Sequence, residues 1–318
     1  MSRFPRVERG KRGAGVTRWI LLLSLHLSAN VIQPLPVHMV YDTEKALLGK
    51  QLFFDPKLSK DGTVACVTCH QPDTGADHRR VSTGIAGRKG SINTPTVFNS
   101  YFNFRQMWNG SVETLNDQVR MPLHNPVEMD MDAKKIIPYL RQNKRYAERF
   151  RQLYGRAATL EDMSNAIAEF EKALITPNSP FDLYLRGKKQ LNKKALEGYR
   201  LFKSLGCVSC HNGINIGGNS FQKIGLIHHY RWSIDNPDRF TVTGRNEDKN
   251  VYKVPSLRNV AITGPYFHDG SVPTLKKALE IMAYHNLGFE LNPDEIEKLT
   301  AFLRTLTGEK PAILRGEE

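Results

Sequence analysis

Long apolar runs and acidic residues are both scarce in this 318-residue chain. Hydrophobic residues make up 40% of it and charged residues 24%, which is typical of a globular domain and excludes a disordered or largely membrane-embedded chain. Lys and Arg total 45 against 32 Asp and Glu, which gives a net charge of +13. No Lys/Arg run is interleaved with aromatic residues, so this charge does not predict nucleic-acid binding. The length allows two domains, each with its own core.

One mostly apolar stretch, Trp19 to Leu27, lies near the N-terminus. It follows a basic stretch that ends at Arg18 and precedes the small residues Ser28 and Ala29, which is the pattern of an export signal. A membrane-spanning helix needs about 20 residues, roughly twice this length. We predict a signal peptide over residues 1–29, a periplasmic location and no stable membrane insertion. An uncleaved N-terminal anchor is the alternative.

Cysteine is rare as well, and all four cysteines occur in two C-x-x-C-H motifs, Cys66 to His70 and Cys207 to His211. In an exported protein, four cysteines ordinarily suggest two disulfides. A histidine directly after each pair instead marks attachment of c-type haem, with both thiols on one helical turn and the histidine placed to bind iron. We therefore predict two covalently bound haem c groups, through Cys66, Cys69, Cys207 and Cys210. A zinc site would need further ligands, and a redox dithiol would not need the histidine.

Similar segments surround the two motifs in the same order. The pattern A-L-x-G-x-x-L-F precedes each one, at 46–53 and 195–202, and G-S-V-x-T-L follows at 110–115 and 270–275. Apolar periodicity predicts a closing helix in each half, at 160–175 and 293–306. Asp42 and Asn292 are suitable N-cap residues. The predicted fold class is all-α, with two cytochrome c-like domains related by internal duplication, at 41–175 and 176–318, joined by a Pro-containing linker at 176–180.

The two halves differ at matching positions, which predicts different roles. Two residues before the glycine of G-S-V-x-T-L, the first half has Trp108 and the second has His268. Only the second half has an obvious methionine in the next helix, Met282 in 276–282, and Met/His ligation gives a closed haem of raised potential. The first half has Glu128, a carboxylate that could move a proton between the oxygens of a peroxide at an open iron. Taken alone, such a Met is ordinarily a core residue and such a Glu a surface acid.

Five longer segments make a more specific pattern, and on them the chain resembles the bacterial dihaem cytochrome c peroxidases and, more loosely, the MauG-type dihaem oxidases. The resemblance extends over about residues 41 to 310. The segments are Asn93 to Thr96, Met107 to Gly110, Pro122 to Met129, Lys253 to Val260 and Pro265 to Gly270.

The resemblance implies a role for individual residues. In the first half, His70 would be the proximal ligand of a low-potential, peroxide-reducing haem. Glu128 would be the catalytic acid/base beside Gln118, and Trp108 would lie on the electron path between the haems. In the second half, His211 and Met282 would be the axial ligands of a high-potential haem, with His268 near the cofactor.

The resemblance also implies a calcium ion between the domains, and a homodimer. Asn93 would bind calcium through its side chain, and Thr263 and Pro265 through their carbonyl groups. Ligands that are all oxygen atoms suit this hard cation.

One position departs from the resemblance. Many family members carry a histidine, in the loop before N-T-P-T, that blocks the peroxidatic iron until the other haem is reduced. Here that position is Ile85, and isoleucine cannot bind iron. We therefore expect an open or water-occupied site at the first haem even in the oxidised protein, unless His78 or Met129 takes the place of the missing histidine.

The leading hypothesis is reduction of hydrogen peroxide to water, with electrons from a small cytochrome c or a cupredoxin that docks near the second haem. Two alternatives remain. The first is MauG-like oxidation of a protein side chain, which the missing histidine favours and Met282, in place of a tyrosine ligand, does not. The second is a dihaem electron carrier in which both irons are six-coordinate.

Overall fold

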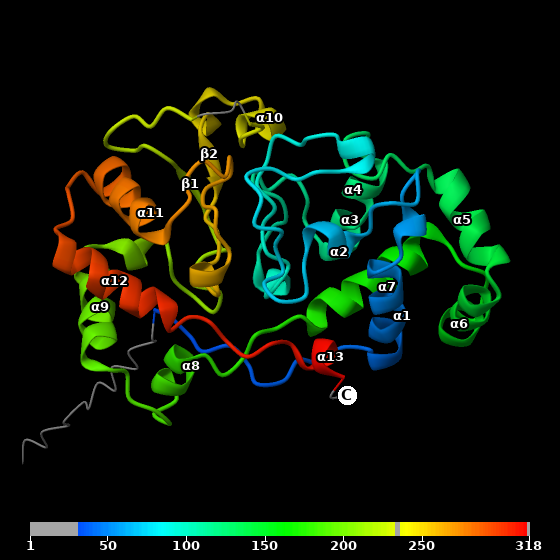
Figure 1. The fold of residues 1–318 in the computed structure, drawn as a ribbon, viewed down its shortest axis with the longest axis horizontal. Coiled ribbons are helices and arrows are strands. Elements are labelled where there is room, and N and C mark those ends of the chain that lie inside the picture. Colours follow the sequence, from blue (N-terminus) through cyan, green and yellow to red (C-terminus); the bar gives the residue numbers. More distant parts are fainter. Residues whose placement is uncertain (1–30, 233–235, 317–318) are drawn as a thin grey trace, which may run out of the picture. The chain divides into compact units, whose positions relative to one another are not determined.

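The computed structural model describes residues 31–232 and 236–316, and the predicted signal peptide lies outside these ranges. The fold is mostly helical (Figure 1). The first half contains α1 (Thr43–Phe53), α2 (Cys66–Cys69), α3 (Leu115–Gln118), α4 (Arg120–His124), α5 (Ala133–Gln142), α6 (Lys144–Tyr154) and α7 (Leu160–Ala173). The second half contains α8 (Pro180–Leu185), α9 (Lys193–Ser204), α10 (Phe240–Thr243), α11 (Leu275–Met282), α12 (Pro293–Arg304) and α13 (Ala312–Arg315).

Short 3₁₀ turns and one ribbon complete the secondary structure. The ribbon pairs β1 (Phe221–Lys223) antiparallel with β2 (Val251–Lys253). The 3₁₀ turns are η1 (Pro56–Leu58), η2 (Ile85–Gly87), η3 (Ser100–Phe102), η4 (Cys207–Ser209), η5 (Asn246–Asp248) and η6 (Val260–Ile262). The prediction of an all-helical fold is therefore correct except for this ribbon. No helix of the described residues has both the length and the apolarity that crossing a bilayer requires.

Each half is built on one pair of closely packed helices, α1 with α7 and α9 with α12 (Figure 1). A glycine permits the close approach in both pairs. A β-carbon at Gly49 would lie 1.9 Å from the carbonyl oxygen of Ala166, and one at Gly198 would lie 1.9 Å from that of Lys298. Both predicted N-caps are confirmed, because Asp42 accepts a hydrogen bond from Lys45 N and Asn292 forms a capping box with Glu295.

The halves meet at a buried hydroxyl group. Asn99 and Asn259 both have left-handed backbone angles, with φ of 62° and 61°. Their side-chain amides both donate to Thr176 Oγ1, at 2.8 and 2.9 Å. Thr176, in the predicted linker, is therefore held from both sides. The linker separates α7 from α8, and Pro180 begins α8, because proline suits the first helical position and Ser179 provides the N-cap.

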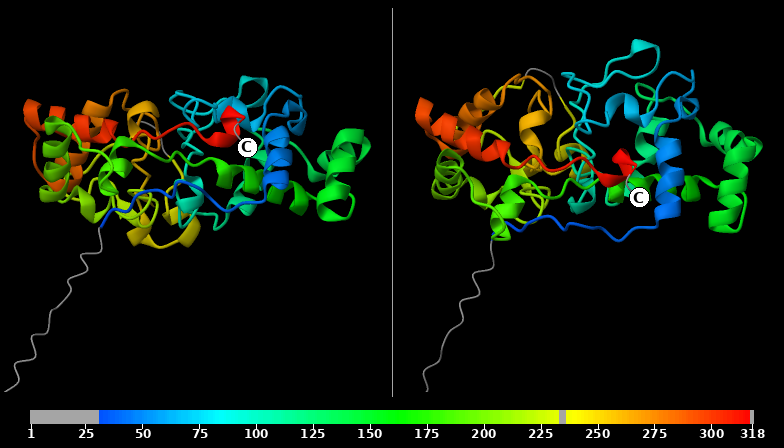
Figure 2. Two further views of the ribbon diagram at one scale, coloured as in Figure 1. Left: turned by 90° about the horizontal axis from the view of Figure 1, so that it is seen from below. Right: turned by 60° about the horizontal axis from the view of Figure 1, so that its bottom comes forward.

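Each end of the described chain packs against the half that is more distant from it in the sequence. Ile313, in α13, is buried in the first-half core, and Lys50 Nζ donates to its carbonyl oxygen at 2.5 Å. Both views in Figure 2 show this C-terminal segment beside α1. At the other end, Ile32 belongs to the second-half core, and Leu35 N donates to Asp182 Oδ1 at 3.0 Å. The predicted division at 175/176 stays a prediction, and each half includes a segment from beyond it.

Candidate haem sites

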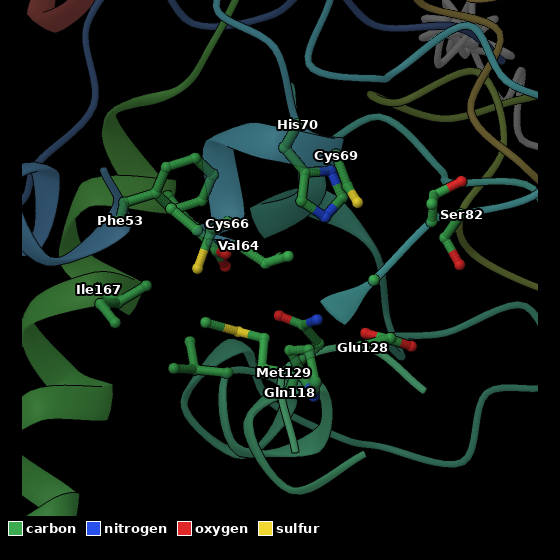
Figure 3. A pocket seen from close by; sticks show the side chains of 16 residues that line it. Phe53, Val64, Cys66, Cys69, His70, Ser82, Gln118, Glu128, Met129 and Ile167 are labelled. Atoms are coloured by element: carbon green, nitrogen blue, oxygen red, sulfur yellow. The ribbon is translucent and has the colours of Figure 1, made fainter. Parts of the chain in front are cut away.

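The first half contains a cavity that is partly open to solvent, with about 530 Å³ of empty space (Figure 3). Its lining comes from α1, α2, the 82–84 loop, α3, the 128–129 segment and α7. Five of the predicted site residues lie in this lining: Cys66, Cys69, His70, Gln118 and Glu128. The structure therefore brings the C-x-x-C-H motif together with the candidate acid/base, although about 60 residues separate them in the sequence.

His70 stands on one side of this cavity, with Gln118, Glu128 and Met129 on the other (Figure 3). His70 Nδ1 lies 3.1 Å from the carbonyl oxygen of Gly75. Because a carbonyl only accepts, Nδ1 carries the proton and Nε2 keeps a free lone pair. Burial lowers the pKa of His70, so the ring stays neutral. A neutral imidazole whose second nitrogen is held by a carbonyl is the form that binds a metal.

The two thiols of the first motif are free and protonated. Burial raises the pKa of Cys66 to about 12 and that of Cys69 to about 11. Both sulfurs lie on the cavity lining beside His70 (Figure 3). A cavity with two unpaired thiols, one neutral histidine and apolar walls such as Val64 and Ile167 fits a covalently attached haem.

Glu128 is a half-buried acid opposite His70. Burial raises its pKa, although a hydrogen bond of 2.8 Å from Asn125 Nδ2 partly offsets this effect. Ile85 N donates to the backbone oxygen of Glu128 at 2.9 Å. The loop that lacks the expected histidine thus lies directly against the candidate acid/base. Ile85 itself is buried in the apolar core.

The two candidates for replacing the missing histidine differ in position. His78 contacts the carbonyl oxygen of Gly264 through Nδ1 and Thr74 Oγ1 through Nε2, each at 3.0 Å. Its two nitrogens are therefore engaged in the loop, and it does not belong to the cavity lining. Met129 is buried and lines the cavity.

Sequence reasoning missed a second acid of this cavity, Glu171 on α7. Only 4% of it is exposed, and Oε2 has no hydrogen-bond partner among the described residues. Burial raises the pKa of Glu171 to about 8. The signal was available, because Glu171 lies on the buried stripe of α7, four residues after Ile167 and next to Phe170.

The second motif shares one aromatic contact with the first. The ring of Phe202 lies 6.5 Å from that of His211, as the ring of Phe53 lies 6.3 Å from that of His70. Burial lowers the pKa of His211 to about 4 and raises that of Cys207 to about 11. These groups, with the free thiol of Cys210, fit a second haem c.

Met282 is the last residue of α11, just before a π-helical turn over Ala283–Leu287. Leu275 and Leu279 of the same helix pack in the apolar cluster that contains Cys207. The structure thus attaches α11 to the second motif, and ligation by Met282 stays a prediction. His285 Nδ1 contacts the carbonyl oxygen of His228 at 2.8 Å, and this contact holds the loop that contains His228.

His268 lies in an aromatic cage of the second half. It is fully buried, and neither ring nitrogen has a hydrogen-bond partner among the described residues. Its ring stacks on Tyr252 at 4.0 Å and meets Trp232 edge-on at 4.1 Å. Burial lowers the pKa of His268 to about 4, so it is neutral. No local sequence pattern indicates this cage, which depends on the β1–β2 ribbon.

Trp108 contacts both halves of the chain. Its Nε1 donates to the carbonyl oxygen of Asn93 at 3.0 Å, and its own carbonyl oxygen accepts from Lys253 N at 2.8 Å. Its ring centre lies 6.2 Å from that of His268. Trp108 thus lies where the halves meet, and its place on an electron path stays a prediction.

The three predicted calcium-binding residues meet a common loop. Asn93 Nδ2 donates to the carbonyl oxygen of Arg79 at 2.8 Å. His78, one residue earlier, contacts the carbonyl oxygen of Gly264, which lies between Thr263 and Pro265. Asn93 and the 263–265 segment are therefore neighbours of the 78–79 loop, and calcium binding there stays a prediction.

A mostly helical chain with two C-x-x-C-H motifs, each with a half-buried neutral histidine, is a dihaem c-type cytochrome. Residues 43–190 match the family model described as di-haem cytochrome c peroxidase, and residues 195–307 match that of cytochrome c. The chain is similar to a cytochrome c551 peroxidase of Nitrosomonas europaea, with 43% identity over 312 residues that cover 93% of this chain and 92% of the relative. This chain belongs to the di-haem cytochrome c peroxidase family.

Two further comparisons support this assignment. A cytochrome c551 peroxidase of Pseudomonas aeruginosa is 41% identical over 274 residues, 84% of this chain and 79% of the relative. A crystal structure of a MauG-like protein associated with microbial copper homeostasis superposes with a TM-score of 0.74 at 27% identity, over 87% of this chain and 93% of that one. Similarity to these cytochrome c peroxidases therefore exceeds similarity to this MauG-like protein.

Proposed function

We propose that this chain reduces hydrogen peroxide to water with electrons from a small cytochrome c or a copper protein. The observation that supports this most is Glu128, a half-buried acid of raised pKa on the cavity wall opposite the neutral His70. Haem iron, when bound at His70, supplies the site where peroxide binds and where electrons are delivered. The names and identities of the curated relatives support the same function.

The residues of the chain would provide proton transfer and orientation. Glu128 takes a proton from the inner oxygen of peroxide and delivers it to the outer oxygen, which leaves as water. The upward shift of its pKa suits this exchange, because it strengthens the carboxyl group's hold on a proton between transfers. Gln118 can orient the peroxide by hydrogen bonding. Val119, Met129 and Ile167, in the same lining, keep bulk water out.

Electrons would enter at the second haem, held by Cys207, Cys210, His211 and Met282, and cross between the halves near Trp108. The contacts of Trp108 with Asn93 and Lys253 support this path. His268, whose ring centre lies 6.2 Å from that of Trp108, would lie near the same path.

We further propose that the halves arose by internal duplication, with domains at 41–175 and 176–318. The paired asparagine contacts with Thr176 and the paired glycine approaches support this origin. A calcium ion bound by Asn93, Thr263 and Pro265, a homodimer, a periplasmic location and a signal over 1–29 complete the proposal.

A steady-state peroxide assay of the as-isolated, oxidised protein with a reduced small cytochrome c tests the proposed function. Glu128→Gln removes the transferable proton but keeps the shape, so we expect turnover to fall by about 10²- to 10⁴-fold. Glu113→Gln is the control, because Glu113 is an exposed acid of the same half, paired with Arg105. It should retain wild-type turnover. Equal rates for wild type and Glu128→Gln would exclude this role of Glu128.

The two alternatives give different results in that assay. A dihaem electron carrier would show no peroxide turnover in the wild type. A MauG-like oxidase would turn over slowly with the cytochrome and would modify a protein side chain in its place.

A further inference from the structure

Basic side chains accumulate just before the second haem-attachment motif. The 28 residues from 183 to 210 contain seven Lys and Arg but one acid, Glu197. The matching 28 residues before the first motif, from 42 to 69, contain four Lys and four acids. The formal charge is therefore +6 before the second motif and zero before the first.

The helix α9 carries much of this charge on its outer face. Ala195, Gly198 and Phe202 face the core. Lys193 and Arg200 are seven residues apart, so they share one side of the helix. This side is opposite the core-facing residues, and both side chains are exposed. Lys203 is exposed one turn further on, with Nζ 4.4 Å from the ring centre of Tyr199.

Salt bridges neutralise only one edge of α9. Lys194 pairs with Glu297 at 3.6 Å, and Glu197 pairs with Lys298 at 3.3 Å, both across to α12. The remaining exposed cations have no carboxylate partner within residues 31–232 and 236–316, and we call them the basic strip: Lys188, Lys189, Lys193, Arg200 and Lys203.

In the first half, charged residues of the matching helix form salt bridges. On α1, Lys45 pairs with Asp42 at 3.2 Å, and Glu44 accepts from Arg149 at 2.8 Å. A basic helix is therefore not a requirement of this frame, and the strip belongs to the second half alone.

The strip leads to the edge where the second haem would be attached. The helix α9 ends at Ser204, one residue after Lys203, and Cys207 follows three residues later. Ser209, between the two thiols, is exposed, while Cys207 and Cys210 are half-buried. A protein that docks on this strip would thus lie next to the second motif.

We propose that the basic strip is the docking surface for the electron donor, and that the donor is a small redox protein with an acidic face. This inference rests on the proposed function. Each docking event would oxidise one donor by one electron, and two such events with two protons convert one hydrogen peroxide into two water molecules. Opposite charge at such a surface raises the association rate by about 10- to 10³-fold at low ionic strength.

The test uses the holoenzyme with two reduced small cytochromes c, one with an acidic haem edge and one with a basic haem edge. The strip variant is Lys193→Glu, Arg200→Glu and Lys203→Glu. The control variant, Lys134→Glu, Lys135→Glu and Lys144→Glu, has the same charge change on exposed positions of α5 and α6. If charge reversal prevents folding, the corresponding three glutamine substitutions on α9 replace it.

Two rates are measured, peroxide turnover and, without peroxide, stopped-flow reduction of the haem. With the acidic cytochrome at low ionic strength, we expect kcat/KM and the reduction rate to fall by about tenfold or more in the strip variant. The control should change by about threefold at most, since its charges lie away from the second motif. Added salt should slow both rates of the wild type with the acidic cytochrome and have little effect on those of the strip variant. The kcat of the strip variant at saturation should stay near the wild-type value.

Equal rates in the strip and control variants would overturn the inference, as would a wild-type preference for the basic cytochrome. Failure of the proposed function looks different. In that case the acidic cytochrome would reduce the haem rapidly and in a strip-dependent way, but peroxide would not be turned over.

Discussion

The two haem-attachment motifs occupy the same helical frame but face different surroundings. In both, a glycine lets two helices meet and a phenylalanine ring lies beside the motif histidine. The first motif faces a cavity with two acids, the half-buried Glu128 and the buried Glu171, whereas the second half contains the aromatic cage of His268. The frame thus specifies where a haem is attached, and the residues around it specify what the haem can do.

The largest expected effect comes from making the first site resemble a closed one. Ile85→His places an imidazole in the loop that contacts Glu128. If the histidine-bound form is 99% populated, apparent peroxide affinity in the oxidised protein falls on the order of a hundredfold. Stopped-flow peroxide binding measures this, with Ile85→Gln as a control for polarity. Binding as fast as in the wild type would mean that position 85 does not reach the iron.

Glu171→Gln tests whether a buried acid of the first cavity makes the stability of the fold depend on pH. The pKa of Glu171 is about 8 in the folded chain, against an ordinary 4.5, so folding favours its protonated form. Its stabilising contribution is complete below pH 4.5 and is lost as pH rises toward 8. Denaturant unfolding of the variant should therefore show a gain over wild type that grows across this window to the order of a few kcal/mol. A difference that does not change with pH would contradict this.

Much of the frame could be predicted from the sequence, because caps and apolar periodicity are local. The predicted helix at 293–306 is α12, two residues too long at its end, and 160–175 is α7, also two residues too long. The helix α7 stops at Ala173 because Leu174 leaves the helical region and its carbonyl oxygen accepts from Asn99 N.

Other parts depend on contacts that sequence patterns do not contain. The helices α5 and α6 were missed although Ile136, Leu140 and Phe150 mark their buried faces. The ribbon strands are only three residues long, too short for a periodic signal. The motif thiols and histidines were evident locally, whereas the meeting of Gln118 with Glu128 was expected only from the family resemblance.

Substitutions that force the two helices of a pair apart should have smaller effects, and the loss of stability should be equal for the two pairs. Gly49→Ala and Gly198→Ala each place a methyl group against a carbonyl oxygen 1.9 Å away. We expect each to lower the free energy of unfolding by roughly 1–3 kcal/mol. Chemical denaturation measures both, with the exposed Arg200→Ala as control. A cost at one glycine alone would mean that the two pairs are not packed alike.

The smallest expected effect comes from removing a single charge from α9 or from the matching helix α1. Lys203→Gln should lower kcat/KM for an acidic donor by about two- to threefold at low salt, because one charge of the basic strip is lost. Lys45→Gln, on α1, should leave it unchanged, since Lys45 is paired with Asp42. Equal losses in both variants would indicate a response to net charge rather than to the strip.

The most direct test of this asymmetry is a cyanide titration of the fully oxidised protein, followed by electron paramagnetic resonance. Because Ile85 cannot bind iron and the cavity opens toward Glu128, one haem should be high-spin and bind one cyanide per chain, with the other low-spin and unreactive. Two low-spin haems that bind no cyanide would contradict the account and leave the chain an electron carrier.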